Sequence, residues 1–198
     1  MLYEIAHIVR DRMPWLWWVT DWVNSEAFHL RYGRRVAQIE KTWGKGIPYT
    51  IVPLRCYDAE EISHFFAHQP AEAFRFFRPH SFDVKSIRQL QKNRAFLAYM
   101  LEQEETLVGY FFLRSFFWGK CFRGRMVDID WRGKGIGTLM NRLMNHLGYG
   151  LGMHIFETVS ADNVASLKSA EAASDIRVLK RLPSNDLYIE VLPKKTNL

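Results

Sequence analysis

The residues with the clearest chemical potential are the glycines of the segment WRGKGIGT, at positions 131 to 138. Gly133, Gly135 and Gly137 allow a sharp turn, and they let several backbone N–H groups approach a ligand without obstruction by side chains. Arg132 and Lys134 add two positive charges to the same loop. Such a loop suits an anion, and we expect that anion to be a diphosphate.

The glycine loop leads directly into a predicted helix over about residues 136–148. The first N–H groups of a helix lack intrahelical partners and carry the positive end of the helix dipole, so the helix start strengthens the anion site. Two common phosphate-binding patterns do not fit the loop, neither GxxxxGK followed by Ser or Thr nor the GxGxxG of a first strand-to-helix turn. The apolar residues of the helix recur at a spacing that predicts one buried face. They are Leu139, Met140, Leu143, Met144 and Leu147.

The spacing R-x-x-G-x-G is carried by Arg132, Gly135 and Gly137. A predicted strand that contains Val127 precedes it, and a further strand and a helix headed by Asn163 follow it. On these residues the chain resembles the GCN5-related N-acetyltransferase (GNAT) superfamily, over about residues 48 to 193. The resemblance implies an α/β fold of mixed α+β type, with a central, mixed, mostly antiparallel twisted sheet flanked by helices. It also implies an acyltransferase that uses acetyl-CoA as its acyl donor.

The same resemblance implies roles for individual residues. The backbone of Met126 and Val127 would pair with the pantetheine arm of coenzyme A like an added strand, and Asn163 would meet the cofactor from the following helix. Asn163 is also well suited to a plain helix cap. The residues implied for the pyrophosphate are Arg132, Gly133, Lys134, Gly135, Ile136, Gly137 and Thr138.

Two side chains that serve as acid and base in part of the family are missing. In members that acetylate protein N-termini, the resemblance would place a glutamate base and a tyrosine acid where this chain has Thr158 and Ala170. A lysine amine with a pKa near 10.4 is neutral less than about one time in a thousand at pH 7, whereas an amine near 8 is neutral roughly a tenth of the time. We therefore expect a small primary amine as acceptor, and amino sugars belong to the second kind. The basic surface would suit a nucleotide-linked sugar with its phosphates. The segment at residues 74–83 also resembles the substrate-facing segment of family members that act on sugar-type substrates in surface polysaccharide pathways, which implies an amino-sugar nucleotide as the leading candidate.

Two other functions stay open. The chain could acetylate protein N-termini or peptides with an acid or base from outside the usual positions. It could also be a non-catalytic module that binds coenzyme A or docks on a membrane, which is the reading that best explains the missing acid and base.

Two ionisable residues are candidates for catalytic proton transfer. His80 lies in the aromatic segment at residues 74–83, and its ordinary pKa suits proton transfer near neutrality, although a loop histidine bonded to backbone is an equally good interpretation. Glu157 lies on a predicted strand beside the expected cofactor cleft. Arg75 and Arg78 either bind a substrate phosphate or form a solvated basic face.

The chain divides into a Trp-rich helical extension at residues 1–46 and an acetyltransferase domain at residues 47–198. The extension is predicted to pack on the domain or on a second subunit in a homodimer. Alternatively it rests on a membrane surface as an amphipathic helix, with Arg31, Arg34 and Arg35 facing lipid phosphates. The aromatic residues behind both interpretations are Trp15, Trp18 and Trp22.

From residue 48 onward, strand-like and helix-like patterns alternate. The predicted strands cover residues 49–55, 95–103, 107–117, 122–130, 154–160, 177–182 and 187–192. The predicted helices cover residues 58–68, 84–91, 136–148 and 163–173.

Length and composition limit the remaining choices. The 198 residues, 48% apolar and 15% aromatic, describe one globular domain with a helical extension. The net charge of +6 favours anionic ligands, but the basic residues are dispersed, so we expect no nucleic-acid partner. Cys56 and Cys121 lack metal-type spacing, which predicts no metal site, no disulfide framework and a reducing, cytoplasmic setting. The apolar run from Met13 to Val23 is too short for a membrane span.

Overall fold

A computed structural model describes residues 14–194 of the chain. Seven strands form one sheet in the order β1-β2-β3-β4-β5-β7-β6. The strands are β1 (Thr50–Pro53), β2 (Phe96–Gln103), β3 (Thr106–Phe116), β4 (Lys120–Val127), β5 (His154–Ser160), β6 (Asp175–Arg181) and β7 (Asp186–Leu192). The α-helices are α2 (Pro14–Thr42), α3 (Ala59–Ala67), α4 (Val84–Lys92), α5 (Ile136–Gly150) and α6 (Val164–Ala173). Three short 3-10 helices are η1 (Leu54–Cys56), η2 (Ala71–Phe74) and η3 (Ile129–Trp131).

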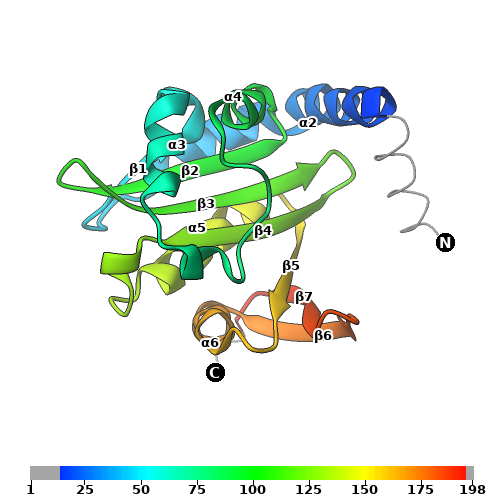
Figure 1. Cartoon of the computed structure of the whole chain (residues 1–198). Helices are drawn as coiled ribbons and strands as arrows, with labels where there is room; N and C mark the ends of the chain where they lie inside the picture. The colour runs from blue at the N-terminus through cyan, green and yellow to red at the C-terminus, as the bar shows by residue number, and fades with distance from the viewer. Residues whose placement is uncertain (1–13, 195–198) are drawn as a thin grey trace.

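The sheet is mixed and mostly antiparallel, as predicted. Five of its neighbouring strand pairs are antiparallel, and β4 with β5 is the parallel pair. That parallel pairing extends only from Lys120 to Phe122 on β4 and from His154 to Phe156 on β5. Beyond these residues the strands separate, and Figure 1 shows β5 turning away from β4 toward β6, β7 and α6. The sheet therefore opens at its centre, next to the glycine loop.

Two hydrophobic cores cover the two faces of the sheet. Alternation along β3 sends Tyr110 and Phe112 to the face covered by α3 and α4, and Phe111 and Leu113 to the face covered by α2 and α5. Helix α3 packs on the sheet through one apolar face, on which Ile62, Phe65 and Phe66 are all buried. Strand β4 contributes to both cores, because Cys121 belongs to the core on the side of α2 and α5 and Met126 to the core on the side of α3 and α4.

Local sequence signals set the starts of several helices. The carboxylate of Asp58 accepts a hydrogen bond from the backbone N–H of Glu60 at the start of α3, and Asp83 caps α4 by accepting from the N–H of Ser86. Asn163 caps α6 in the same way, with its side chain accepting from the N–H of Ser166. These caps place the predicted helices within a residue or two of their expected bounds.

Helix α2 is part of the main core. Phe28, Tyr32 and Val36 belong to the core cluster between α2, α5 and the sheet. The amide of Asn24 donates to the carbonyl O of Ser115 over 3.0 Å and accepts from the N–H of Phe117 over 3.1 Å. These contacts fix α2 against the turn that joins β3 and β4.

Trp18 and Trp22 do not pack on the domain, which is one of the two placements that the sequence analysis gave for them, and packing on a second subunit stays a prediction. Trp18 is 68% exposed and Trp22 is 57% exposed, and none of the side chains from residue 18 to residue 23 is buried. This part of α2 contacts the domain through other side chains, because Asp21 accepts a hydrogen bond from the Asn93 amide over 2.7 Å and Asn24 bonds the β3–β4 turn, while Trp18 and Trp22 are left exposed. Only the backbone of Trp15 lies within the description of α2, so its predicted packing stays a prediction.

The described helices include none that is long and apolar enough to cross a membrane.

Candidate active site

A cleft of about 620 Å³ opens where β4 and β5 separate. Its walls come from β4, the glycine loop, the first turn of α5 and the N-terminal half of α6, and η2 with the chain after it forms the opposite wall. Nine of the ten residues predicted to bind the cofactor line this cleft. They are Met126, Val127, Arg132, Gly133, Gly135, Ile136, Gly137, Thr138 and Asn163.

The glycine loop presents open backbone to the cleft. Gly133 and Gly135 both have φ of +78°, a conformation that side chains strongly disfavour, and Gly135 is the residue that precedes the first turn of α5. A Cβ at either position would meet no atom within 4 Å, so nothing in the described chain occupies the space over these glycines. The loop and the start of α5 together thus fit the phosphates of a nucleotide-type ligand.

The two cations of the loop differ in their placement. Arg132 lines the cleft, whereas Lys134 is not among the lining residues. The Nζ atom of Lys134 instead lies 4.2 Å from the centre of the Trp131 ring, as a cation–π contact. Trp131 itself lines the cleft, so Lys134 packs on a residue of the cleft wall.

Asn163 combines the two roles considered for it from the sequence. Its side-chain oxygen accepts from the N–H of Ser166 over 3.1 Å, and the residue also lines the cleft. The helix start of α6 therefore faces the same space as the helix start of α5.

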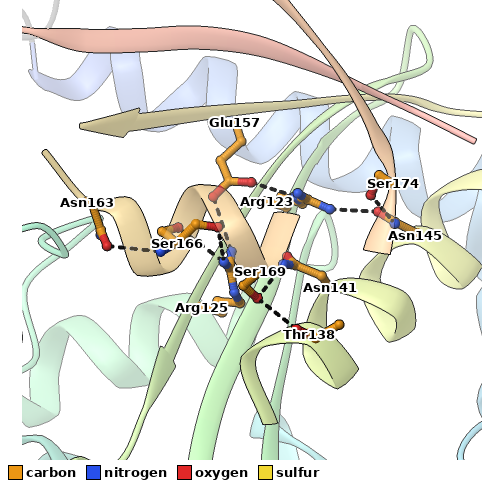
Figure 2. A network of polar contacts seen from close by, with 10 residues as sticks. All are labelled: Arg123, Arg125, Thr138, Asn141, Asn145, Glu157, Asn163, Ser166, Ser169 and Ser174. Atoms are coloured by element: carbon orange, nitrogen blue, oxygen red, sulfur yellow. Dashed lines mark hydrogen bonds and ion pairs between the residues drawn. The ribbon is translucent and has the colours of Figure 1, made fainter. Parts of the chain in front are cut away.

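Glu157 lies in a buried ion-pair network between β4 and β5, which Figure 2 shows. Its Oε2 is 2.7 Å from Nε of Arg123, and its Oε1 is 3.2 Å from Nη1 of Arg125. Burial alone would raise the pKa of Glu157, but the charges and hydrogen bonds of the two arginines outweigh it and hold that pKa below its usual value. Glu157 is therefore a charged carboxylate with two partners in place.

Neutral side chains continue this network to α5 and α6. Arg123 donates to the side chain of Asn145 over 2.8 Å, and Asn145 donates to Ser174 over 2.7 Å. Asn141 donates to the hydroxyl of Ser169 over 3.1 Å. The two helices are thus joined by the hydrogen bond between Asn141 on α5 and Ser169 on α6, which Figure 2 shows.

His80 lies away from the cleft, under α3. Its Nδ1 is 2.8 Å from the carbonyl O of Ser81, and its Nε2 is 2.9 Å from the hydroxyl of Tyr110. Phenylalanine rings surround it, among them Phe82 and Phe96. Burial lowers the pKa of His80, and the charge of Arg114 lowers it further against the hydrogen bond to Ser81. The ring is not among the residues that line the cleft.

The sequence analysis missed several residues of the cleft. Arg125, Ser166, Lys168 and Ser169 line it from β4 and α6. The sequence did contain a signal for Arg125. Arg123 and Arg125 lie at alternate positions of one strand, and a later strand carries Glu157. Such a pattern indicates a buried ion pair. No sequence signal showed that the opposite wall consists of Glu72, Ala73, Phe76 and Phe77.

Arg75 and Arg78 do not line the cleft, although they belong to the segment that supplies its opposite wall. The guanidinium of Arg75 lies 4.8 Å from the centre of the Phe76 ring. In residues 14–194, no group of three or more histidine, cysteine or acidic side chains is arranged to hold a metal ion. Both cysteines are free thiols, Cys56 exposed and Cys121 buried.

No protein-family model matches the chain, and no curated protein matches it in sequence. Solved structures do match in fold. The GNAT domain of S. lividans PAT superimposes with a TM-score of 0.61 at 11% identity, covering 72% of this chain and 89% of that one. YncA, a putative acetyltransferase from Salmonella typhimurium solved with its cofactor acetyl-CoA, gives a TM-score of 0.57 at 18% identity over 75% and 95% of the chains. A chimera of the Vibrio cholerae spermidine N-acetyltransferase SpeG and hSSAT gives a TM-score of 0.58 at 17% identity, covering 74% of this chain and 96% of that one.

The chain has the GNAT fold, which confirms the fold predicted from the glycine loop. Thr158 and Ala170 stand at the positions where the resemblance would place a base and an acid in part of the family. Thr158 is exposed on β5, and Ala170 is fully buried on α6.

Proposed function

We propose that the chain is an acetyl-CoA-dependent N-acetyltransferase that acts on a small primary amine. The observation that carries this proposal is the cleft at the separation of β4 and β5, with the open glycine loop and two helix starts around it. The similarity in fold to acetyltransferases, one of them solved with acetyl-CoA, supports the same conclusion.

Acetyl-CoA would supply an activated acetyl thioester. The N–H groups of residues 133–138 would hold its pyrophosphate at the start of α5, with Arg132 adding a full positive charge. The exposed backbone edge of Met126 and Val127 would pair with the pantetheine arm, because β5 no longer pairs with β4 beyond Phe122. Asn163 would contact the cofactor from α6.

The acceptor would approach from the wall formed by Glu72, Ala73, Phe76 and Phe77. An amino-sugar nucleotide remains the leading acceptor from the sequence analysis. Because Arg75 and Arg78 do not line the cleft, the phosphates of this acceptor would have to contact other cations, such as Lys168. An acceptor without phosphates needs no such contact.

The catalytic roles predicted for His80 and Glu157 stay predictions, and their surroundings favour different tasks. Glu157 is already paired with two guanidinium groups, and a carboxylate held in its charged form is a weak proton acceptor. His80 lies outside the cleft lining. We propose that Glu157 fixes β4 to β5, that His80 supports the aromatic core, and that an amine with a pKa near neutrality needs no strong base.

The test of cofactor binding is calorimetry with acetyl-CoA on two matched glycine variants. Gly135→Glu places a negative charge in the loop, and we expect it to abolish detectable binding. Gly152→Glu is the control, because Gly152 has a similar φ of +74°, equally open space around its Cβ and a position at the far end of α5. No binding by the unchanged chain, or equal binding by the two variants, would refute the proposal.

The acceptor is tested by a mass-spectrometric screen of acetyl-CoA turnover. Amino-sugar nucleotides, polyamines and peptides form the three arms. Acetylation in the peptide arm alone would favour an acetyltransferase of protein N-termini, and coenzyme A binding without turnover in any arm would favour a non-catalytic module.

We also propose that the exposed apolar stripe of α2 contacts a membrane surface or a second copy of the chain. The stripe consists of Trp18, Val19, Trp22 and Val23, all exposed. Two of the three arginines once expected to face lipid are turned to the domain, because Arg31 donates to the carbonyl O of Phe117 and Arg35 to that of Leu151. Liposome flotation and sedimentation of the full chain, with and without Trp18→Ser and Trp22→Ser, separate the two contacts. If the substitutions reduced neither liposome binding nor self-association, both the membrane contact and the contact with a second copy would be excluded.

A further inference from the structure

Arg125 contacts the first turns of both α5 and α6 at the cleft. Its Nε lies 3.7 Å from the position that a Cβ atom on Gly137 would occupy, and Gly137 is the second residue of α5. Its Nη2 donates to the carbonyl O and to the hydroxyl of Ser166 in the first turn of α6, each over 3.1 Å (Figure 2). Arg125, Gly137 and Ser166 all line the cleft. The guanidinium therefore lies between two helix starts.

The guanidinium of Arg125 belongs to a buried group with one positive charge in excess. Arg123 and Arg125 share the carboxylate of Glu157, and the side chains of the three residues are 0%, 6% and 6% exposed, respectively. Within residues 14–194 neither arginine has a second carboxylate at ion-pair distance. Arginine stays protonated in proteins. Arg123 does not line the cleft, so the excess charge faces the cleft through Arg125.

One N–H group of Arg125 has no acceptor in the part of the chain that the structure describes. The hydrogen bonds of Arg125 come from Nη1, which donates to Glu157, and from Nη2, which donates to Ser166. Nε donates to none of residues 14–194, although more than nine tenths of the side chain is buried. A buried donor without a partner is unfavourable. Arg125 can therefore serve an acceptor from outside the described chain.

The surroundings of Arg125 add positive charge instead of compensating it. The first N–H groups of a helix carry the positive end of the helix dipole, so an anion is favourable beside a helix start and a cation is not. Arg125 lies beside two such starts. Among the described residues that line the cleft, Glu72 is the only carboxylate, and it lies on η2 in the opposite wall. An anion in the cleft would thus offset positive charge from three sources at once.

The other cations near the cleft act more weakly on such an anion. Arg132 and Lys168 line the cleft but are exposed, so water and salt screen their charges. Lys134 is not among the lining residues. A charge shielded from water acts more strongly on its neighbours than a solvated one. Arg125 is the lining cation that is shielded.

We propose that Arg125 supplies the dominant side-chain charge that binds the diphosphate of coenzyme A. The inference rests on the proposed function, in which the N–H groups of residues 133–138 hold that diphosphate at the start of α5. The guanidinium lies on the side of Gly137 that faces α6, and its charge acts on the phosphate oxygens across the first turn of α5. The loop cation Arg132, which the sequence analysis put first, then has the smaller effect.

The test measures the Kd of coenzyme A by calorimetry for two variants of Arg125. Arg125→Gln keeps a hydrogen-bond donor and removes the charge, and we expect it to raise the Kd by about tenfold or more. Arg125→Lys keeps the charge without the planar group that bonds Ser166, and its Kd should stay within about threefold of that of the unchanged protein. Arg125→Gln leaves Arg123 and Glu157 as a one-to-one ion pair, so we expect this variant to fold, and urea unfolding checks that it does.

Two further variants remove the same charge elsewhere. Arg142→Gln is the control, because Arg142 is exposed on α5 and does not line the cleft, so the Kd of coenzyme A should not change by more than about twofold. Arg132→Gln should raise the Kd by less than Arg125→Gln does. A larger effect of Arg132→Gln would overturn the proposal.

Phosphorus NMR of bound coenzyme A locates the effect on the ligand. The signals of the diphosphate are separate from that of the 3′-phosphate, which serves as an internal reference. Arg125→Gln should move the diphosphate signals and leave the 3′-phosphate signal in place. A change confined to the 3′-phosphate would contradict the assigned role.

The proposal on Arg125 and the proposed function fail in different ways. Equal Kd values for Arg125→Gln and the unchanged protein would overturn the role of Arg125. So would weaker binding by Arg125→Lys than by Arg125→Gln, because bonding to Ser166 and not charge would then decide affinity. If Arg125→Gln did not fold, a tenfold loss of affinity in folded Arg125→Lys would have the same meaning. Failure of the unchanged protein to bind coenzyme A would instead refute the proposed function.

Discussion

The hydroxyl of Tyr110 and Nε2 of His80, which lies 30 positions earlier in the chain, are joined by a hydrogen bond of 2.9 Å. The other ring nitrogen, Nδ1, donates to the carbonyl O of Ser81. The Ser81 carbonyl can only accept, so Nδ1 carries a proton, and the lowered pKa that burial gives His80 favours the neutral imidazole, in which Nε2 accepts from the Tyr110 hydroxyl. The contact closes the segment at residues 74–83 onto β3, and that segment supplies part of the cleft wall.

His80→Leu is expected to lower the free energy of unfolding by about 1–3 kcal/mol near pH 7.5, because the buried Tyr110 hydroxyl loses its acceptor. The ordinary pKa of 6.5 applies to the unfolded chain and the folded value lies below it. The unfolded state therefore binds the proton more readily, and the stability that neutral His80 contributes is complete above 6.5 and is lost as the pH falls through the folded pKa. Urea unfolding should show a cost of His80→Leu that shrinks from about pH 7.5 to about pH 5. A cost independent of pH would contradict the assigned protonation state, and Tyr110→Phe with His80→Leu should cost less than the two single changes together.

Glu157→Gln is expected to destabilise the fold by about 3–5 kcal/mol, because it leaves two buried guanidinium groups without their carboxylate. The matched control is Glu60→Gln, which breaks the exposed pair of Glu60 with Arg88 and should cost about 0–1 kcal/mol. Denaturant unfolding at neutral pH measures both. Equal costs would show that the buried network contributes no more than a surface ion pair.

Phe28→Ala is expected to cost about 3–5 kcal/mol of stability, since Phe28 is 1% exposed in the core between α2 and the sheet. Trp22→Ala, one and a half turns earlier on the same helix, should change stability by no more than about 0.5 kcal/mol. Thermal and denaturant unfolding compare the two variants. A large effect of Trp22→Ala with none of Phe28→Ala would contradict the packing of α2.

The turn between β2 and β3 offers a stabilising change. Glu104 and Glu105 have φ of +49° and +66°, a pair of left-handed conformations for which Asn-Gly is strongly preferred. Replacing them by Asn and Gly should raise the free energy of unfolding by about 1 kcal/mol or more. The change also removes the charge of Glu105, which adds to burial in raising the pKa of Glu102. The variant with Gln at both positions removes the charges alone, and it should give less of the gain.

The sequence by itself determined the glycine loop, the helix behind it and most of the strands. These features depend on local chemistry: the freedom of Gly133 and Gly135 at positive φ, the helical spacing of apolar residues in α5, and the cap at Asn163. The cofactor roles of single residues came from the family resemblance that these patterns carry, and nine of the ten residues proposed for the cofactor line the cleft.

The tertiary structure decided the surroundings of the loop. Arg125 and Glu157 lie 32 positions apart, and their pairing depends on how β5 leaves β4, which no local pattern fixes. Likewise, α2 packs through Phe28 instead of Trp22 because Asn24 bonds to residues more than 90 positions away. Burial and charge pairing result from contacts between distant elements, so the role of Glu157 and the positive charge at the cleft wall became visible only in the folded chain.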